Sequence, residues 1–248
     1  MFENLKILWH QGKQFIPDPT KAEVPGVFKG RPVISKVPVD EARLAASCPT
    51  GAIGTNPVSV DLGKCTFCGE CAINFPEKIS FTKDYKIATN DRGRLFVYEG
   101  VDEPITINPE KVRKEITRIF GNSLKLRQVS AGGDNSNEWE LNAANNVQFD
   151  MSRYGIEFVA SPRHADGIVI TGPVSENMAE PLQICYDAIP DPKIIILAGT
   201  DAISGGIFHE SEAINRSFLD KYEIDLYIPG NPVHPLTFIN GILSYLKH

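Results

Sequence analysis

Four of the five cysteines have the spacing of an iron–sulfur ligand set. Cys65, Cys68 and Cys71 follow one another with two residues between each pair, and Cys48 stands upstream in a Cys-Pro pair. Three thiolates on one short loop, joined by a fourth from a distant Cys-Pro, can hold a cuboidal cluster. The spacing therefore predicts one [4Fe–4S] cluster on these four residues, and with it the transfer of single electrons.

A second cluster of the same kind lacks its ligands. In two-cluster proteins each Cys-x-x-Cys-x-x-Cys-x-x-x-Cys-Pro run gives its last cysteine to the other cluster. The positions that a second set would occupy, upstream of Cys48 and downstream of Cys71, hold other residue types: Pro38, Glu41, Leu44 and Phe75. All four ligands of one cluster are present and all four of the other are absent, which favours a single cluster.

Two other uses of these cysteines stay open. Structural zinc sites usually contain two separate Cys-x-x-Cys pairs, whereas this chain has three cysteines on one loop. Disulfides require an oxidising compartment, and we expect no secretory signal at the start of the sequence. Cys185 lies in an apolar helical stretch and is expected to be a small buried hydrophobe.

The composition argues against two kinds of partner. A net charge of −6 disfavours nucleic acid, because phosphate binding needs clustered cationic side chains. The longest apolar runs, such as 194–198, are far shorter than the roughly 20 residues that cross a bilayer. With 248 residues, the chain has room for one large or two modest domains. No Ser/His/Asp or Cys/His arrangement indicates a complete substrate-converting site.

Residues 1–28 are expected to form a helix followed by an extended arm. Phe2, Leu5, Leu8 and Trp9 fall on one face at helical spacing, and prolines interrupt the sequence that follows. This apolar face is expected to pack against one of three surfaces: a membrane, a neighbouring subunit or the chain's own domain.

Residues 29–105 are expected to form an α+β unit that positions the cysteines, with one helix before Cys48 and another after Cys68. The expected strands are short and bounded by turn residues: 32–35, 58–61, 79–82 and 95–98. Asn108-Pro109 then predicts the start of a helix over 110–120, which Gly121 ends. Residues 106–122 therefore connect this unit to the remainder of the chain.

Residues 123–248 alternate between apolar strands and helices, which predicts an α/β domain. The expected strands lack polar alternation, as is typical of a parallel sheet covered on both faces: 124–129, 156–159, 167–171, 194–197 and 224–228. Ligands of such sheets bind outside the carboxyl ends of the strands. In this chain those ends lead into 130–137, 199–206 and 230–235.

The second half resembles a family of redox subunits, and the resemblance rests on five motifs: Ser161-Pro-Arg-His-Ala-Asp166, Thr171-Gly-Pro-Val174, Pro190-Asp-Pro-Lys193, Ser204-Gly-Gly-Ile-Phe208 and Tyr227-Ile-Pro-Gly230. They are similar to those of the small subunit shared by complex I, as its 20 kDa subunit, and by the energy-converting [NiFe] hydrogenases, including the formate hydrogenlyase type. The first hundred residues, with Phe28-Lys-Gly-Arg-Pro32, resemble the ferredoxin-like modules of the same complexes. The resemblance implies a ferredoxin-like α+β domain followed by a flavodoxin-like α/β domain.

The resemblance also implies partners and a location. In that family the subunit carries the last [4Fe–4S] cluster and docks on a large subunit that bears the [NiFe] or quinone site. We therefore expect a large-subunit partner and membrane subunits of the same complex, which would hold this chain on the cytoplasmic inner face of the cell membrane. Arg163 and His164 belong to a family segment near the terminal cluster, and we expect them at the large-subunit interface or behind the redox centre.

The chain departs from the family at the ligands of the terminal cluster. The resemblance assigns cysteines to four positions that hold other residues: Asp134, Asn137, Asp201 and Asn231. Carboxylate and amide oxygens suit hard cations better than an iron–sulfur centre. We therefore expect this cluster to be absent while the fold is kept. A hydrogen-bonded network with trapped water, or a hard cation such as Mg²⁺ or Ca²⁺, would fill the space.

Two functions follow from these patterns. The first is an electron-transfer subunit of a membrane-associated oxidoreductase complex, which carries one [4Fe–4S] cluster. The second is a scaffold or redox-sensing subunit of a hydrogenase-related complex that has lost its terminal redox relay. The altered residues favour the second, because an electron leaving the retained cluster has no familiar next centre in this chain.

Overall fold

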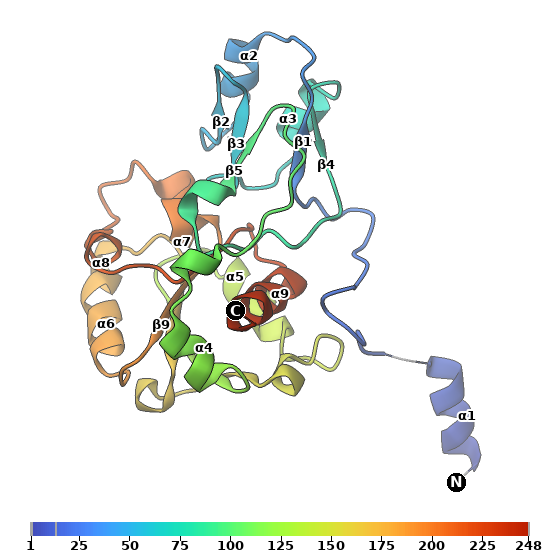
Figure 1. The fold of residues 1–248 in the computed structure, drawn as a ribbon, viewed down its shortest axis with the longest axis vertical. Helices are drawn as coiled ribbons and strands as arrows, with labels where there is room; N and C mark the ends of the chain where they lie inside the picture. The colour runs from blue at the N-terminus through green and yellow to red at the C-terminus, as the bar shows by residue number, and fades with distance from the viewer. Residues whose placement is uncertain (1, 13, 248) are drawn as a thin grey trace.

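The computed structural model describes residues 2–12 and 14–247. Three residues lie outside the described part of the chain. Met1 and Lys13 belong to the predicted helix and arm, and His248 belongs to the predicted α/β domain. Helix α1 (Phe2–Gln11) has no buried residue, and Trp9 is 90% exposed. It lies away from the rest of the molecule (Figure 1). None of the described helices has the length and apolar character needed to cross a bilayer.

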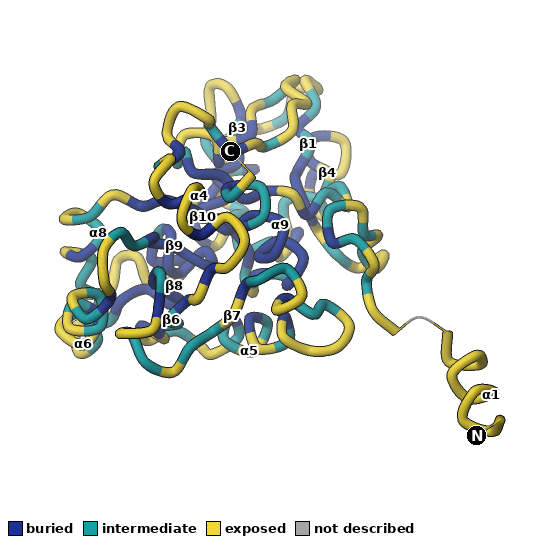
Figure 2. The backbone as a smooth tube through the Cα atoms, turned by 60° about the horizontal axis from the view of Figure 1, so that its bottom comes forward, coloured by how far each residue is buried: buried dark blue, intermediate teal, exposed yellow. Residues whose placement is uncertain are grey.

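The arm that follows α1 is held on the body by polar contacts. The Ile16 N–H donates to the Gln148 carbonyl at 2.8 Å, and the Tyr85 hydroxyl donates to the Pro19 carbonyl at 2.7 Å. The arm therefore packs on its own chain, whereas every residue of α1 is exposed in Figure 2.

Two small antiparallel sheets form the region that carries the cysteines, which matches the predicted α+β unit (Figure 1). One sheet pairs β1 (Pro32–Ile34) with β4 (Ile79–Phe81). The other has the order β2 (Ile53–Gly54), β3 (Ser59–Asp61), β5 (Phe96–Tyr98). Two short helices and one 3-10 turn complete the region: α2 (Glu41–Ala46), α3 (Glu70–Asn74) and η1 (Arg92–Leu95).

A five-stranded sheet forms the second half, and all of its strand pairs are parallel, which confirms the predicted α/β architecture. The strand order is β10-β9-β8-β6-β7. Its strands are β6 (Leu124–Ser130), β7 (Ile156–Phe158), β8 (Gly167–Thr171), β9 (Ile194–Ala198) and β10 (Leu226–Ile228).

Helices cover both faces of this sheet. Ile168 and Ile195 belong to an apolar cluster with Leu182 of α6 and Phe218 of α8, whereas their neighbours Val169 and Ile196 belong to a cluster with α4, α5 and α9. Successive side chains on a strand point to opposite faces, so each strand serves both clusters. The helices are α4 (Lys114–Phe120), α5 (Ser136–Ala143), α6 (Glu176–Asp187), α7 (Thr200–Ser204), α8 (Ser217–Lys221) and α9 (Pro235–Leu246). Four 3-10 turns complete this half: η2 (Pro109–Lys111), η3 (Met151–Tyr154), η4 (Pro162–His164) and η5 (Gly206–Phe208).

The two halves share one core. The cluster on the α6 face of the sheet continues into the antiparallel region through residues such as Leu44, Val60 and Ile87. A backbone bridge also joins the halves: the Thr89 N–H donates to the Tyr227 carbonyl at 3.0 Å, and the Tyr227 N–H donates back at 2.8 Å.

The prediction of a continuous helix over 110–120 is wrong. Asn108 caps the short turn η2, and α4 begins only after Arg113. Val112 and Arg113 between them have extended backbone, with ψ of 125° and 100°. This break has a tertiary cause, because it places the Arg113 side chain at the amino ends of β9 and β10.

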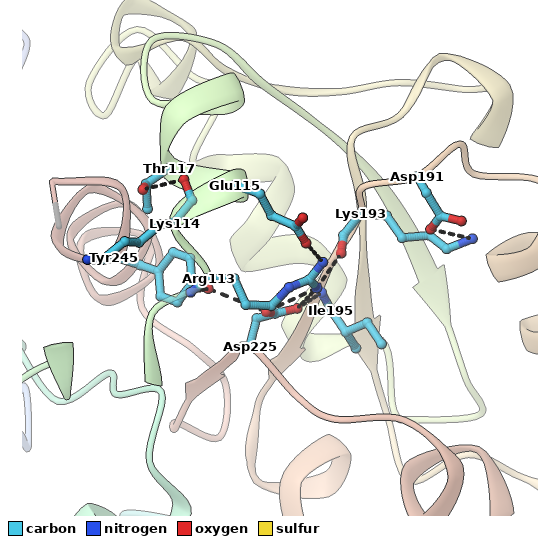
Figure 3. Close-up of polar contacts among 9 residues, drawn as sticks. All are labelled: Arg113, Lys114, Glu115, Thr117, Asp191, Lys193, Ile195, Asp225 and Tyr245. Atoms are coloured by element: carbon cyan, nitrogen blue, oxygen red, sulfur yellow. Dashed lines mark hydrogen bonds and ion pairs between the residues drawn. The ribbon is translucent and has the colours of Figure 1, made fainter. Parts of the chain in front are cut away.

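Arg113 joins a buried polar network that ties this connecting segment to the sheet (Figure 3). Its guanidinium donates to the Lys193 carbonyl at 2.9 Å and pairs with Asp225 Oδ1 at 3.4 Å. Asp225 Oδ2 also accepts the Ile195 N–H at 2.8 Å, and Tyr245 donates its hydroxyl to Asp225 Oδ1 at 3.3 Å. Burial raises the pKa of Asp225, which its hydrogen bonds and Arg113 partly offset. The carboxylate is therefore costly to bury and depends on these partners.

We expect Asp225→Ala to lower the free energy of unfolding by about 2–4 kcal/mol, because it leaves the Ile195 N–H without its acceptor and removes the buried carboxylate that pairs with Arg113. Chemical denaturation of the full chain measures the change. The matched control is Glu115→Gln, which removes an exposed partner of the same arginine and should cost less than about 1 kcal/mol. Equal effects of the two substitutions would contradict the structural role of the network.

Candidate functional site

The structure brings Cys48, Cys65, Cys68 and Cys71 to the wall of one cavity. Cys48 follows the end of α2, Cys65 and Cys68 lie on the loop after β3, and Cys71 belongs to α3. The remainder of the wall is largely apolar and includes Ala52, Ile53, Val60 and Phe81. The residues that the sequence predicted as one ligand set therefore surround one space.

Backbone N–H groups face two of the four sulfurs. The Phe67 N–H donates to Cys65 Sγ at 3.3 Å, and the Ala52 N–H donates to Cys48 Sγ at 3.3 Å. Phe67 has a φ of 55°, in the left-handed region that non-glycine residues seldom adopt, and its backbone turns the loop around the cavity. Such N–H···S contacts stabilise negative charge on sulfur and tune iron–sulfur centres.

The cysteine environment opposes free thiolates. Burial, together with the charges of the neighbouring cysteines, raises the pKa of Cys65 to about 12 and that of Cys71 to about 11. The mutual effect of the thiols follows from their shared cavity. Metal binding displaces thiol protons, so a metal cluster would supply the positive charge that this cavity lacks.

The donor set fits a cuboidal cluster. Among residues 2–12 and 14–247, no group of three or more His, Cys, Asp or Glu side chains is arranged around a single metal ion. A four-iron cube binds each of its thiolates through a different iron, so its ligands surround a larger centre than one ion. The four thiols, the enclosed apolar wall and the N–H groups that face sulfur all fit that centre. Cys185 is only half-buried, lies beside Arg127 and is not part of the wall.

Sequence reasoning missed the groups that anchor the cysteine loop. Arg92 forms two hydrogen bonds to the buried carboxylate of Asp61, at 2.8 and 2.6 Å. The same carboxylate accepts the Gly63 N–H at 2.8 Å, and the Asp61 carbonyl accepts the Cys65 N–H at 2.9 Å. Asp61 stands two residues before Gly63, and an Asp in this position is typical of a turn. No local pattern identifies Arg92 as the partner of its carboxylate.

Two further contacts reach the carbonyls of predicted ligands. The Thr200 hydroxyl donates to the Cys65 carbonyl at 2.8 Å, and the Lys29 ammonium donates to the Cys68 carbonyl at 2.9 Å. Thr200 is fully buried at the start of α7, whereas Lys29 is exposed. The cysteine loop therefore rests directly on the carboxyl edge of the parallel sheet.

The four positions with altered residues all follow carboxyl ends of parallel strands. Asn137 is buried, and its Oδ1 accepts the Val233 N–H at 2.9 Å. Asp134 is exposed and accepts hydrogen bonds from the N–H and hydroxyl of Ser136, which lower its pKa. Asn231 is half-buried and lines a separate cavity.

Asp201 differs from the other three, because one oxygen of its buried carboxylate is unpaired among the residues that the structure describes. The residue is 3% exposed, and its Oδ1 has no hydrogen-bond partner in the described part of the chain. Burial, together with the charges of Asp134 and Glu138, raises the pKa of Asp201 to about 6. The expected network with trapped water, and the alternative of a hard cation, stay predictions.

Arg163 and His164 lie on η4, which connects β7 to β8 across β6. Both residues are exposed. Neither side chain forms a hydrogen bond or ion pair with another described residue. The expectation that they meet a partner subunit stays a prediction.

The second half of the chain is similar in sequence to known proteins. Residues 135–245 match the family described as NADH ubiquinone oxidoreductase, 20 Kd subunit. The chain is 32% identical over 148 residues to the probable membrane-bound hydrogenase subunit mbhJ of Pyrococcus furiosus, which covers 58% of this chain and 89% of that protein. It is 38% identical over 146 residues to formate hydrogenlyase subunit 7 of Escherichia coli, which covers 59% of this chain and 56% of that protein.

A solved structure is also similar. It is described as the membrane-bound sulfane sulfur reductase, an archaeal respiratory membrane complex. One of its chains aligns with a TM-score of 0.46 and 30% identity, over 54% of this chain and 73% of that chain.

Asp201→Asn should raise the free energy of unfolding above pH 6 by about 1–3 kcal/mol. The folded-state pKa of Asp201, about 6, is above the ordinary value of 3.8, so the native state binds more protons between these values. Wild-type stability therefore falls as the pH rises from about 4 to about 6, and the variant lacks this fall. Denaturation curves across this pH range measure the difference.

A loss of stability in Asp201→Asn at pH 8 would show instead that the carboxylate has a stabilising partner. If Mg²⁺ or Ca²⁺ then stabilised only the unsubstituted chain, that partner would be a hard cation.

Proposed function

Because this chain belongs to the family of the 20 kDa subunit of NADH ubiquinone oxidoreductase, we propose that it is an electron-transfer subunit of a membrane-associated oxidoreductase complex, and that it carries one [4Fe–4S] cluster. Its relatives are subunits of membrane-bound hydrogenase, formate hydrogenlyase and NADH-quinone oxidoreductase. The observation that carries the proposal is the cavity that all four predicted cysteines line.

Cys48, Cys65, Cys68 and Cys71 would hold the cluster as thiolates. A bound [4Fe–4S] cluster supplies one-electron chemistry. The protein's own contribution is to exclude water with the apolar wall and to direct the N–H groups of Ala52 and Phe67 at two sulfurs. Both features act on the relative stability of the oxidised and reduced states.

The partner in this proposal is a large subunit of the hydrogenase or complex I type. The exposed Arg163 and His164 of η4 would lie at the interface with this subunit. Bonds of the substrate would be made and broken in that partner. Membrane subunits of the complex would then hold the chain at the inner face of the cell membrane.

The same proposal divides the chain into four segments. They are the amino-terminal helix and arm (1–28), the ferredoxin-like cluster domain (29–105), the connecting segment (106–122) and the small-subunit-like domain (123–248). The change from antiparallel to parallel sheets supports this division.

Anaerobic purification followed by iron and sulfide counting should give about four irons per chain, and dithionite should produce the EPR signal of a reduced [4Fe–4S] cluster. Cys65→Ser and Cys71→Ser should lose most of that iron. Cys185→Ser is the matched control and should retain it, because Cys185 is outside the cavity wall. Zinc in place of iron, or iron loss in the control alone, would refute the ligand assignment.

A second candidate function is a scaffold or redox-sensing subunit in a complex that has lost its terminal relay. The residues that favour it occupy the altered ligand positions: Asp134, Asn137, Asp201 and Asn231. The two functions can be separated in the purified whole complex. If the chain transfers electrons, the reduced cluster is reoxidised and its EPR signal disappears when the large subunit's electron acceptor is added. A signal that persists during turnover would favour the scaffold or sensor.

A further inference from the structure

We propose that Thr200 is a positioning residue for the iron–sulfur centre: its hydroxyl holds the peptide group that follows Cys65 and thereby raises the reduction potential of the cluster. This inference rests on the proposed [4Fe–4S] cluster. It concerns a residue of the parallel-sheet half that acts on a redox site in the other half.

The hydrogen bond is short and shielded from water. Thr200 Oγ1 lies 2.8 Å from the Cys65 carbonyl oxygen, and both residues are buried. The Gly230 carbonyl is a second acceptor for the hydroxyl at 3.3 Å, but it already accepts the Thr200 N–H at 2.9 Å. Gly230, which follows β10, therefore fixes the Thr200 backbone through the Thr200 N–H. Of the two hydrogen bonds available to the Thr200 hydroxyl, the one to the Cys65 carbonyl is shorter.

The helix that presents Thr200 is itself held in place. The Arg216 guanidinium donates to the Ala202 and Ile203 carbonyls at 2.8 and 2.9 Å, which satisfies acceptors at the end of α7. The cysteine loop packs closely against this helix, since a Cβ on Gly63 would lie 2.8 Å from Ile203 Cγ2. The hydroxyl therefore acts from a rigid support.

The effect on the cluster follows from peptide geometry. A trans peptide is planar, so its C=O and N–H point in opposite directions. With the Cys65 carbonyl held on Thr200, the Thr66 N–H points away from α7, and Thr66 lines the cavity together with Cys65. This N–H has no hydrogen-bond partner among the described residues. Hydrogen bonding to the carbonyl polarises the amide and strengthens its N–H dipole.

An oriented N–H dipole stabilises the more negative, reduced state of a nearby iron–sulfur centre. Removing the Thr200 hydroxyl would weaken that dipole and relax the peptide. The reduction potential should therefore become more negative, while the four thiolate ligands stay in place.

The test compares Thr200→Val with Thr200→Ser in the full chain, purified anaerobically. Valine keeps the branched shape and removes the hydroxyl, whereas serine restores it. Ser204→Ala is the matched control, because it removes a hydroxyl of the same helix that donates to the Thr200 carbonyl and accepts the Gly206 N–H but has no contact with the cysteine loop among the described residues. The measurements are iron per chain and the midpoint potential from an EPR-monitored redox titration.

We expect about four irons in all of these proteins, a more negative potential in Thr200→Val, and wild-type potentials in Thr200→Ser and Ser204→Ala. A wild-type or more positive potential in an iron-replete Thr200→Val protein would overturn the inference and leave the proposed cluster intact. A wild-type chain without iron and sulfide would instead refute the proposed function, and this inference with it.

If Thr200→Val does not assemble a cluster, Thr200→Cys provides a second test. Its thiol is a weaker hydrogen-bond donor than a hydroxyl, so the midpoint potential should shift in the negative direction with full iron content. An unchanged potential in that variant would overturn the inference.

Discussion

The ion pair between Arg92 and Asp61 is the contact on which the geometry of the cysteine loop depends. One buried carboxylate binds the guanidinium through two hydrogen bonds and also accepts the Gly63 N–H, while the same residue's carbonyl accepts the Cys65 N–H. The start of the loop is therefore fixed by a single side chain and its backbone. Four thiols are costly to deprotonate in an apolar cavity, and the anchored loop keeps them around one space.

The two halves of the molecule divide the chemistry between them. The antiparallel region provides four thiols in a largely apolar cavity wall. The carboxyl edge of the parallel sheet carries aspartate and asparagine side chains at the four positions to which the family resemblance assigns cysteines. At this edge Asn137 accepts the Val233 N–H and so joins α5 to the segment that follows β10. Asp201 has no such contact, since one oxygen of its buried carboxylate is without a described partner.

The predictable features of this fold are those that local sequence determines. Unbroken apolar runs such as 194–198 predicted buried parallel strands, and the cysteine spacing predicted one ligand set. The break at Val112 and Arg113 was not predictable, because it exists to reach Asp225, more than a hundred residues away in the sequence. The contact between Thr200 and Cys65 likewise joins distant residues of ordinary type. Local patterns cannot identify such pairs, since only the folded chain brings them together.

The backbone bridge between Thr89 and Tyr227 covers part of an edge of the parallel sheet. β10 is an outermost strand, and an outermost strand offers unpaired N–H and C=O groups that recruit other chains. Thr89 uses the N–H and the C=O of Tyr227 on that open side. The amino-terminal half thus protects this edge strand from pairing with another molecule. A fragment that contained the parallel sheet alone would expose β10 and could aggregate through it.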